Sequence, residues 1–138
     1  MIYETEKDYS DCVNEQQFKM RFIKNELSKI HDDIFCIETE ETVHGFPDVL
    51  AIGNKDGGLN IATFYEFKIS NKVGRIKFQP TQPAFYRRHR NLGVIIVALN
   101  KKSGKVHTIN DASLFCETSL YRTNELGEVN LNTSEAVK

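Results

Sequence analysis

Two carboxylates and a lysine occur within two apolar segments of the chain, where charged side chains are costly unless they are paired. Asp48 follows a Gly-Phe-Pro sequence, and Glu66 and Lys68 come eighteen and twenty residues later. Charged side chains that are held together in apolar surroundings are typical of a functional site. We therefore treat these three residues as the candidate centre of the protein's chemistry.

The elements that carry these residues form a predicted β-hairpin. The segments 46–52 and 61–69 are rich in β-branched and aromatic residues, and a Gly, Asn and Asp turn sequence separates them. If Ile52 pairs with Ala62 in an antiparallel hairpin, the two carboxylates lie directly opposite each other. Their Cβ atoms would then be about 4.5–5.5 Å apart, and the lysine would project from the same face.

Two carboxylates at that distance repel each other unless something neutralises them. A shared proton is one solution, and a divalent cation with oxygen ligands is another. Mg²⁺ is the usual cation where phosphate is the substrate, and a nearby lysine could position a water or stabilise charge. The alternative is structural: Pro-Asp begins a strand, and Glu-x-Lys belongs to an ordinary exposed strand edge.

The spacing of these residues resembles a known family. Residues 45–48 (Gly-Phe-Pro-Asp) followed by 66–68 (Glu-Phe-Lys) resemble the motif of the PD-(D/E)xK nuclease superfamily. The sequence Phe-Gln-Pro-Thr-Gln at 78–82, a helix, and a Gly-led apolar strand at 94–99 are similar to the small VRR-NUC domains and the Holliday-junction resolvases. The resemblance covers residues 15–100.

This resemblance implies a metal site and a catalytic lysine. Asp48 and Glu66 would be metal ligands, with help from the Phe67 carbonyl, and Lys68 would be the catalytic lysine. Glu15 would be the acidic residue of the first helix, although a favourable acid at a helix N-terminus explains it equally well. The implied cofactor is Mg²⁺, with Mn²⁺ as a substitute.

The resemblance also implies a glutamine beside the lysine. Gln82, at the start of the following helix, is the candidate, and Gln79 competes with it for this role.

The charge of the chain is strongly segregated along the sequence. Residues 67–110 contain ten Lys and Arg and no Asp or Glu, whereas the rest of the chain has eight basic and nineteen acidic residues. Such a basic block is typical of a protein that binds phosphate backbones, and the alternative is a solvated basic surface. The expected nucleic-acid-binding residues are Lys72, Arg75, Lys77, Arg87, Arg88 and Arg90.

The sequence predicts two main helices. The first runs from Asn14 to Ile30, is capped near Asn14, and has an apolar stripe. The stripe comprises Met20, Ile23, Leu27 and Ile30, widened by Phe18 and Phe22. The second helix runs from Thr81 to Leu92, with Thr81 as its cap.

Further strands are predicted at 34–39, 94–99 and 105–109, and the polar segment 71–78 reads as a basic loop. This order predicts an α/β fold with a mixed central sheet flanked by helices. The resemblance implies that the fold is a restriction-endonuclease-like αβββαβ core.

Length and composition predict one domain, at residues 14–122. It follows an N-terminal segment at 1–13 and precedes a polar C-terminal tail or arm at 123–138. No apolar run has transmembrane length, the acidic N-terminus does not resemble a signal peptide, and an intracellular location is expected. The three widely spaced cysteines are expected to be buried reduced thiols.

The function predicted from these observations is a Mg²⁺-dependent DNA endonuclease that hydrolyses phosphodiester bonds. Structure-specific cutting is expected, as in DNA recombination or repair, because no separate recognition module is visible. A branched substrate with two-fold symmetry would favour a homodimer or higher homo-oligomer. Two alternatives remain open: a sequence-specific or nicking endonuclease of the restriction or homing type, and a catalytically idle nucleic-acid-binding subunit.

Overall fold

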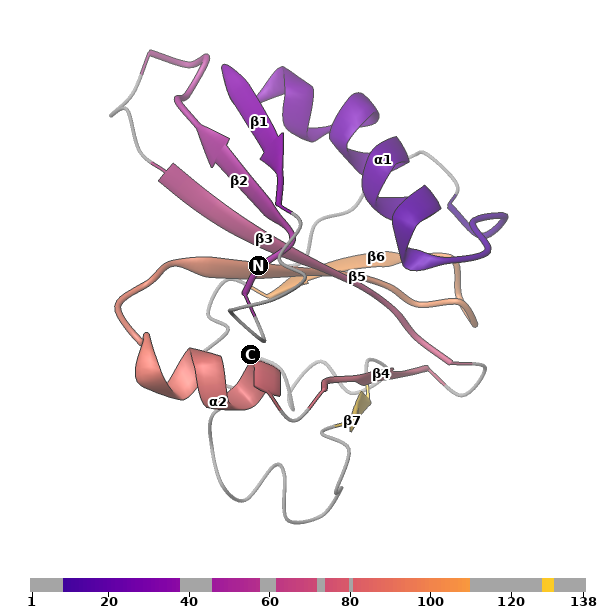
Figure 1. Ribbon diagram of the computed structural model, residues 1–138. Coiled ribbons are helices and arrows are strands. Elements are labelled where there is room, and N and C mark those ends of the chain that lie inside the picture. Colours follow the sequence, from indigo (N-terminus) through magenta and orange to yellow (C-terminus); the bar gives the residue numbers. More distant parts are fainter. Residues whose placement is uncertain are drawn as a thin grey trace.

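The computed structural model describes residues 9–37, 46–57, 62–71, 74–79 and 81–109, together with the backbone of 128–130 (Figure 1). These residues form a mixed α/β fold. Its elements are α1 (Glu15–Asn25), the 3₁₀ turn η1 (Leu27–Lys29), β1 (Asp33–Cys36), β2 (Val49–Ile52), β3 (Ala62–Ile69), β4 (Arg75–Lys77), α2 (Thr81–Arg88), β5 (Val94–Leu99), β6 (Val106–Ile109) and β7 (Glu128–Asn130).

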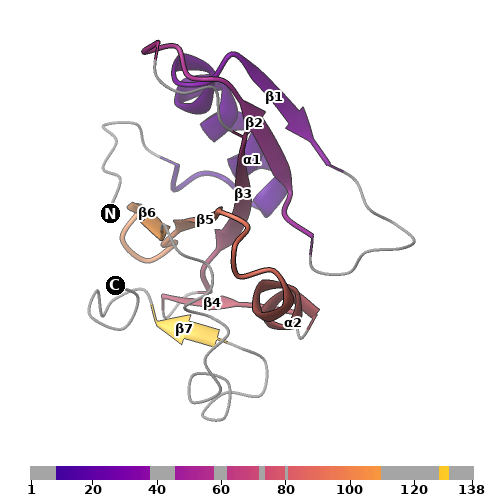
Figure 2. The same cartoon turned by 90° about the vertical axis from the view of Figure 1, so that its left-hand side faces the viewer.

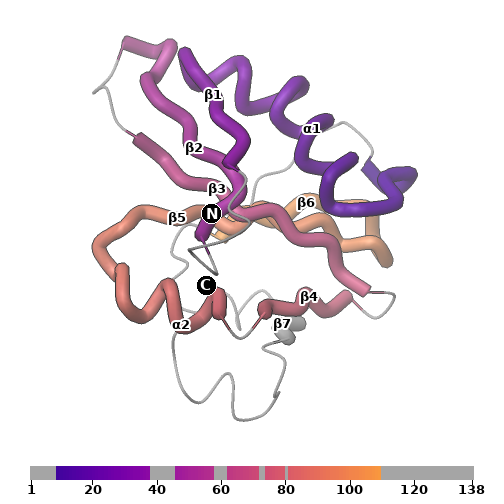
Figure 3. The backbone as a smooth tube through the Cα atoms, viewed as in Figure 1, coloured from indigo at the N-terminus to yellow at the C-terminus, as the bar shows by residue number. Residues whose placement is uncertain are grey.

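Five strands form the central sheet, in the order β1-β2-β3-β5-β6. The central strand β3 pairs antiparallel with β2 and parallel with β5, so the sheet is mixed. The parallel pairing requires a crossover connection, and the crossover carries β4 and α2, as the backbone trace in Figure 3 shows. The prediction of an α/β fold with a mixed sheet is therefore confirmed.

Two apolar clusters cover the two faces of this sheet. Helix α1 packs on one face, and α2 and β4 lie on the other (Figures 1 and 2). Because side chains alternate along a strand, β3 contributes to both faces. Tyr65 and Phe67 join the α1 cluster, which leaves Glu66 and Lys68 on the face that α2 covers.

The first helix begins as predicted but is shorter. Asn14 is its N-cap and accepts a hydrogen bond from the Gln17 backbone N–H. The predicted extension to Ile30 is wrong, because Glu26 departs from helical geometry (φ −124°, ψ −57°) and only a 3₁₀ turn follows.

The predicted apolar stripe of α1 is also wrong in part. Met20 is 48% exposed and Ile30 36%, whereas Phe18 and Phe22 are buried with Leu27, and Ile23 is partly buried. The two phenylalanine rings pack against Phe67 and Tyr9 with centroid separations of 5.5–5.9 Å. These aromatic contacts turn the helix so that its Phe side faces the sheet.

The segment between β3 and α2 is not simply a loop, as was predicted for 71–78. It contains β4, whose central Ile76 is fully buried while its two basic neighbours are exposed. Strand β4 pairs antiparallel with β7, which lies within the expected C-terminal tail. Part of that tail therefore belongs to a second, two-stranded sheet.

The remaining strands agree closely with the sequence. The strand predicted at 94–99 is β5, and those predicted at 105–109 and 34–39 are observed at Val106–Ile109 and Asp33–Cys36. The second helix ends at Arg88, earlier than the predicted Leu92, and continues as two hydrogen-bonded turns. Because Thr81 is already helical, its predicted role as the cap is not observed.

The N-terminal segment packs on the first helix, and one of the two described cysteines differs from expectation. Tyr9 and Cys12, both placed before the domain in the predicted boundaries, are fully buried in the α1 cluster. Cys36 is an exposed free thiol, so the prediction of buried cysteines is wrong for this residue, and Cys116 lies outside the described residues. In the part of the chain that the structure describes, no helix is long and apolar enough to span a membrane.

Candidate active site

The hairpin register brings the two motif carboxylates together. Ile52 pairs with Ala62, as predicted, and the ladder ends at Val49 opposite Tyr65. Asp48 is the next residue beyond this end, and its Oδ2 accepts a hydrogen bond of 3.1 Å from the Phe67 backbone N–H. The carboxylate thus occupies the place where the ladder of β2 would have continued.

A hydrogen-bonded chain connects β3 to α2. Lys68 Nζ donates to Gln82 Oε1 at 2.7 Å, and Gln82 Nε2 donates to Glu66 Oε2 at 2.9 Å. The Lys68 ammonium is 3.9 Å from Glu66 Oε2, an ion pair that is longer than a hydrogen bond. All three side chains are buried. Because the amide contacts both charged groups, it fixes their separation.

The two candidate glutamines differ in position. Gln82 makes the contacts described above, and its Oε1 also accepts the Gln79 backbone N–H at 3.0 Å. This last bond resembles the one that a helix residue makes back to the N-cap in a capping box. Gln79 itself is exposed. Of the two, Gln82 is therefore the residue that lies beside the lysine.

Lys68 also has an aromatic neighbour that sequence reasoning missed. Its Nζ lies 5.2 Å from the centroid of the Phe78 ring, within the range of a cation–π interaction. Phe78 follows β4 directly and is fully buried. The sequence analysis did single out the Phe-Gln-Pro-Thr-Gln segment, which Phe78 begins. Because the preceding residues were predicted to form a loop, nothing indicated that the Phe78 ring would contact Lys68.

Glu66 has an unfavourable environment for a charged carboxylate. Burial raises its pKa well above the ordinary value, the charge of Asp48 raises it further, and Lys68 opposes the rise. A protonated Glu66 can also donate a hydrogen bond to Asp48, which raises this pKa again. Its Oε1 is buried without a hydrogen-bond partner among the described residues.

Glu15 reaches the same group of charges from the start of α1. The side chain is exposed, but the protein atoms around its carboxyl still raise its pKa, while Lys68 lowers it and Asp48 raises it. The Ile69 backbone, next to Lys68, lowers it as well. All four charged residues of the predicted centre therefore influence one another.

The oxygen donors at this position fit a hard divalent cation. In an extended strand, the N–H and C=O of one residue point to the same side, so the Phe67 carbonyl faces the side on which Asp48 lies. Within the described ranges, no group of three or more His, Cys, Asp or Glu side chains has a metal-binding arrangement. Mg²⁺ is commonly bound by only one or two carboxylates, with waters and phosphate completing its shell. Glu66 Oε1, which accepts no hydrogen bond from the described residues, could serve as a ligand for such a cation.

The predicted nucleic-acid-binding residues lie on the elements that cover this face of the sheet. Arg75 and Lys77 are exposed on β4, and Arg87, Arg88 and Arg90 are exposed in and after the last turn of α2. Lys72 lies outside the described residues. Lys101, by contrast, donates hydrogen bonds to the backbone carbonyls of Ser10 and Cys12 and anchors the N-terminal segment.

Comparison with known proteins gives no relative: no family model matches the chain, and neither the curated proteins nor the solved structures contain a significant match.

Proposed function

We propose that this protein is a Mg²⁺-dependent DNA endonuclease of the PD-(D/E)xK kind. The observation that supports it best is the meeting of Asp48 with Glu66 at the end of β2, with Lys68 on the same strand as Glu66. A structural role would favour neutral or well-paired groups here, yet the ionised Glu66 has a buried oxygen without a donor among the described residues. The motif resemblance supplies the reaction class.

Each residue would have a distinct role in phosphodiester hydrolysis. Asp48, Glu66 and the Phe67 carbonyl would hold the cation, with Glu15 of α1 as a further candidate ligand. A bound Mg²⁺ supplies Lewis-acid stabilisation of the phosphate and lowers the pKa of a water. Lys68, kept in place by Gln82, would orient that water and stabilise negative charge on the phosphate oxygens.

The exposed basic residues on β4 and α2 support nucleic acid as the substrate, and the resemblance favours DNA. Structure-specific cutting is the version that we propose, since the described chain has no separate reading module. A homodimer would suit a two-fold branched substrate and stays a prediction for light scattering to test.

The proposal is tested by two substitutions that keep the shape of the site. Asp48→Asn retains an oxygen for the Phe67 N–H, and Glu66→Gln retains an oxygen for the Gln82 amide. We expect each to reduce Mg²⁺-dependent cleavage of duplex, flap and four-way-junction DNA by at least ~100-fold. Exposed Asp56→Asn is the matched control and should cleave like the wild type. Undiminished cleavage by either site variant would show that the carboxylates are not the metal ligands.

A further inference from the structure

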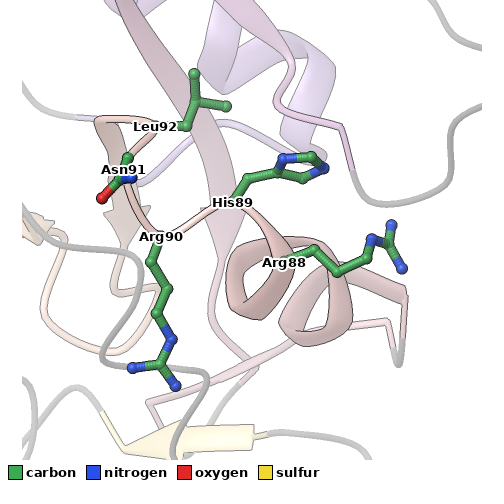
Figure 4. Close-up of a pocket in the computed structure, with 5 residues that line it drawn as sticks. All are labelled: Arg88, His89, Arg90, Asn91 and Leu92. Carbon is green, nitrogen blue, oxygen red and sulfur yellow. The ribbon is translucent and has the colours of Figure 1, made fainter.

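A pocket of about 350 Å³ opens where α2 ends (Figure 4). Pockets that bind small molecules typically measure ~300–1,000 Å³, so this one has room for a single nucleotide. Five consecutive residues line it: Arg88, His89, Arg90, Asn91 and Leu92. The first four of them are exposed, and Leu92 is partly buried.

The lining combines the groups that recognise the parts of a nucleotide. Guanidinium groups bind phosphate, an imidazole offers a flat ring for stacking, and an asparagine amide can pair with a base edge. In Figure 4 the side chains of Arg88 and Arg90 leave the chain in different directions. They would therefore contact different phosphates rather than clamp one. The His89 ring lies on the Arg88 side, and Asn91 lies on the other side of Arg90.

A row of aromatic rings connects this pocket to the candidate active site. The His89 ring lies 4.6 Å from the Phe85 ring, centroid to centroid, and Phe85 lies 5.4 Å from Phe46. Phe46 comes two residues before Asp48 and also packs on Phe64 of β3. The pocket therefore lies on the same face of the sheet as the carboxylates.

The length of α2 determines the distance between this pocket and Gln82 of the candidate active site. Arg88 is six residues after Gln82 in this helix, and a rise of about 1.5 Å per residue gives ~9 Å. Successive phosphates of one strand advance about 3.4 Å along a duplex axis. For a DNA strand that runs along α2, the pocket is thus two to three nucleotides away from a phosphate bound beside Gln82.

We infer that this pocket receives an unpaired nucleotide two to three positions from the scissile phosphate. This inference rests on the proposed function and specifies its substrate class. In a fully paired duplex the base edges are engaged and the bases stacked, so the pocket reads a base only where pairing is interrupted. The pocket then selects DNA with an unpaired base near the cut.

Binding measured by fluorescence anisotropy in EDTA tests the inference without cleavage. Two labelled duplexes are compared, one fully paired and one with a single unpaired adenosine. We expect the wild type to bind the second about tenfold more tightly, and His89→Ala and Asn91→Ala to lose this preference while binding the paired duplex as before. Lys24→Ala, an exposed control on α1, should keep it.

Equal affinity of the wild type for the two duplexes overturns the inference, as does a preference that both pocket variants retain. If the wild type cleaves DNA with Mg²⁺ but shows no such preference, the inference alone fails. If it neither binds nor cleaves either duplex, the proposed function fails as well. Circular dichroism confirms that the variants are folded, and a 2-aminopurine at the unpaired position reports directly whether the base stacks in the pocket.

Discussion

The side chain of Gln82 is neutral, but the two ends of its amide contact groups of opposite charge. Its oxygen accepts from Lys68 and its nitrogen donates to Glu66. A reversed amide would face donor with donor and acceptor with acceptor, so the network selects one orientation. The position of the lysine thus depends on a residue from a different element.

Gln82→Ala should therefore impair both stability and turnover. We expect unfolding free energy to fall by about 1–3 kcal/mol, since Lys68 and Glu66 each lose a buried hydrogen bond, and cleavage to fall ~10–100-fold. Chemical denaturation and single-turnover cleavage measure the two effects. Gln79→Ala is the control, because the side chain is exposed and only its backbone N–H takes part. Equal effects of Gln82→Ala and Gln79→Ala would show that Gln82 does not have the role assigned to it in the site.

Glu66 makes the stability of the metal-free protein depend on pH. Its folded pKa is raised by burial and by Asp48, so the folded state retains a proton that the unfolded chain releases. The stabilising contribution is complete below the ordinary pKa of a glutamate and is lost as pH rises through the raised folded value.

Glu66→Gln should remove this loss of stability at higher pH, because a glutamine does not titrate. Without divalent cations, we expect the variant to be more stable than the wild type by about 1 kcal/mol at neutral pH. In a domain of this size, that difference raises the melting temperature by a few °C. Near pH 4 the two proteins should melt at the same temperature. Thermal melts across this pH range, with Asp56→Asn as a control, provide the measurement. Coincident curves for wild type and Glu66→Gln at every pH would contradict the assigned environment.

The turn between β2 and β3 depends on two glycines in the left-handed region of φ. Gly53 has φ +87° and Gly57 has φ +78°. A Cβ at Gly53 would lie 2.2 Å from Asp32 Oδ2, whereas one at Gly57 would meet nothing within 4 Å. The Gly53 carbonyl also bonds with the buried His31 ring, whose other nitrogen contacts the Tyr65 hydroxyl.

The two glycines form a matched pair for mutation. Gly57→Ala should cost about 1–2 kcal/mol, because an L-residue is strained at positive φ. Gly53→Ala should cost about 1 kcal/mol more, since Asp32 must also move away. Urea denaturation of both variants gives the comparison. Indistinguishable unfolding free energies would mean that the contact with Asp32 is relieved without cost.

The sequence was most informative about elements whose pattern is set locally. The run at 94–99 is apolar throughout, as a strand covered on both faces must be, and its bounds were predicted correctly. The end of α1 and the strand β4 were not, because both depend on distant partners. Phe18 and Phe22 of α1 pack against Phe67 of β3, and β4 pairs with β7, which lies about fifty residues later in the chain.

The same reasoning explains what could be predicted of the site. Asp48 and Glu66 belong to one hairpin, so a register assumption was enough to bring them together. Gln82 and Phe78 belong to the crossover between β3 and β5, and they contact Lys68 because of how this crossover packs on the sheet. Local sequence patterns do not predict that packing. The choice between Gln79 and Gln82 therefore had to wait for the structure.

Across the whole molecule, the exposed basic residues of the site face are separated from those of the α1 face by the sheet. Arg87 and Arg88 lie in the last turn of α2, and Lys24 and Lys29 lie in α1 and η1 on the other face. Both pairs are exposed. Replacing either pair by glutamate changes the net charge equally.

This symmetry allows a controlled test of the proposed DNA-binding face. We expect Arg87→Glu with Arg88→Glu to weaken DNA binding and to reduce the slope of log K against log salt by about 0.9 for each phosphate that the protein no longer neutralises. The Lys24→Glu, Lys29→Glu double variant should change affinity much less. Affinity measured at several salt concentrations distinguishes them. Equal losses of affinity would indicate an effect of net charge rather than of a face.

The position of β1 at the edge of the sheet has a practical consequence for measuring assembly. This strand carries Phe35, 51% exposed, and the exposed thiol of Cys36. Edge strands readily pair with one another, and two accessible thiols brought close together can oxidise in air to a disulfide. A covalent dimer formed in this way during storage would have twice the 15.8 kDa chain mass and yet bear no relation to a two-fold nuclease. Light scattering of this protein is therefore meaningful only with a reductant present, or on a Cys36→Ser variant.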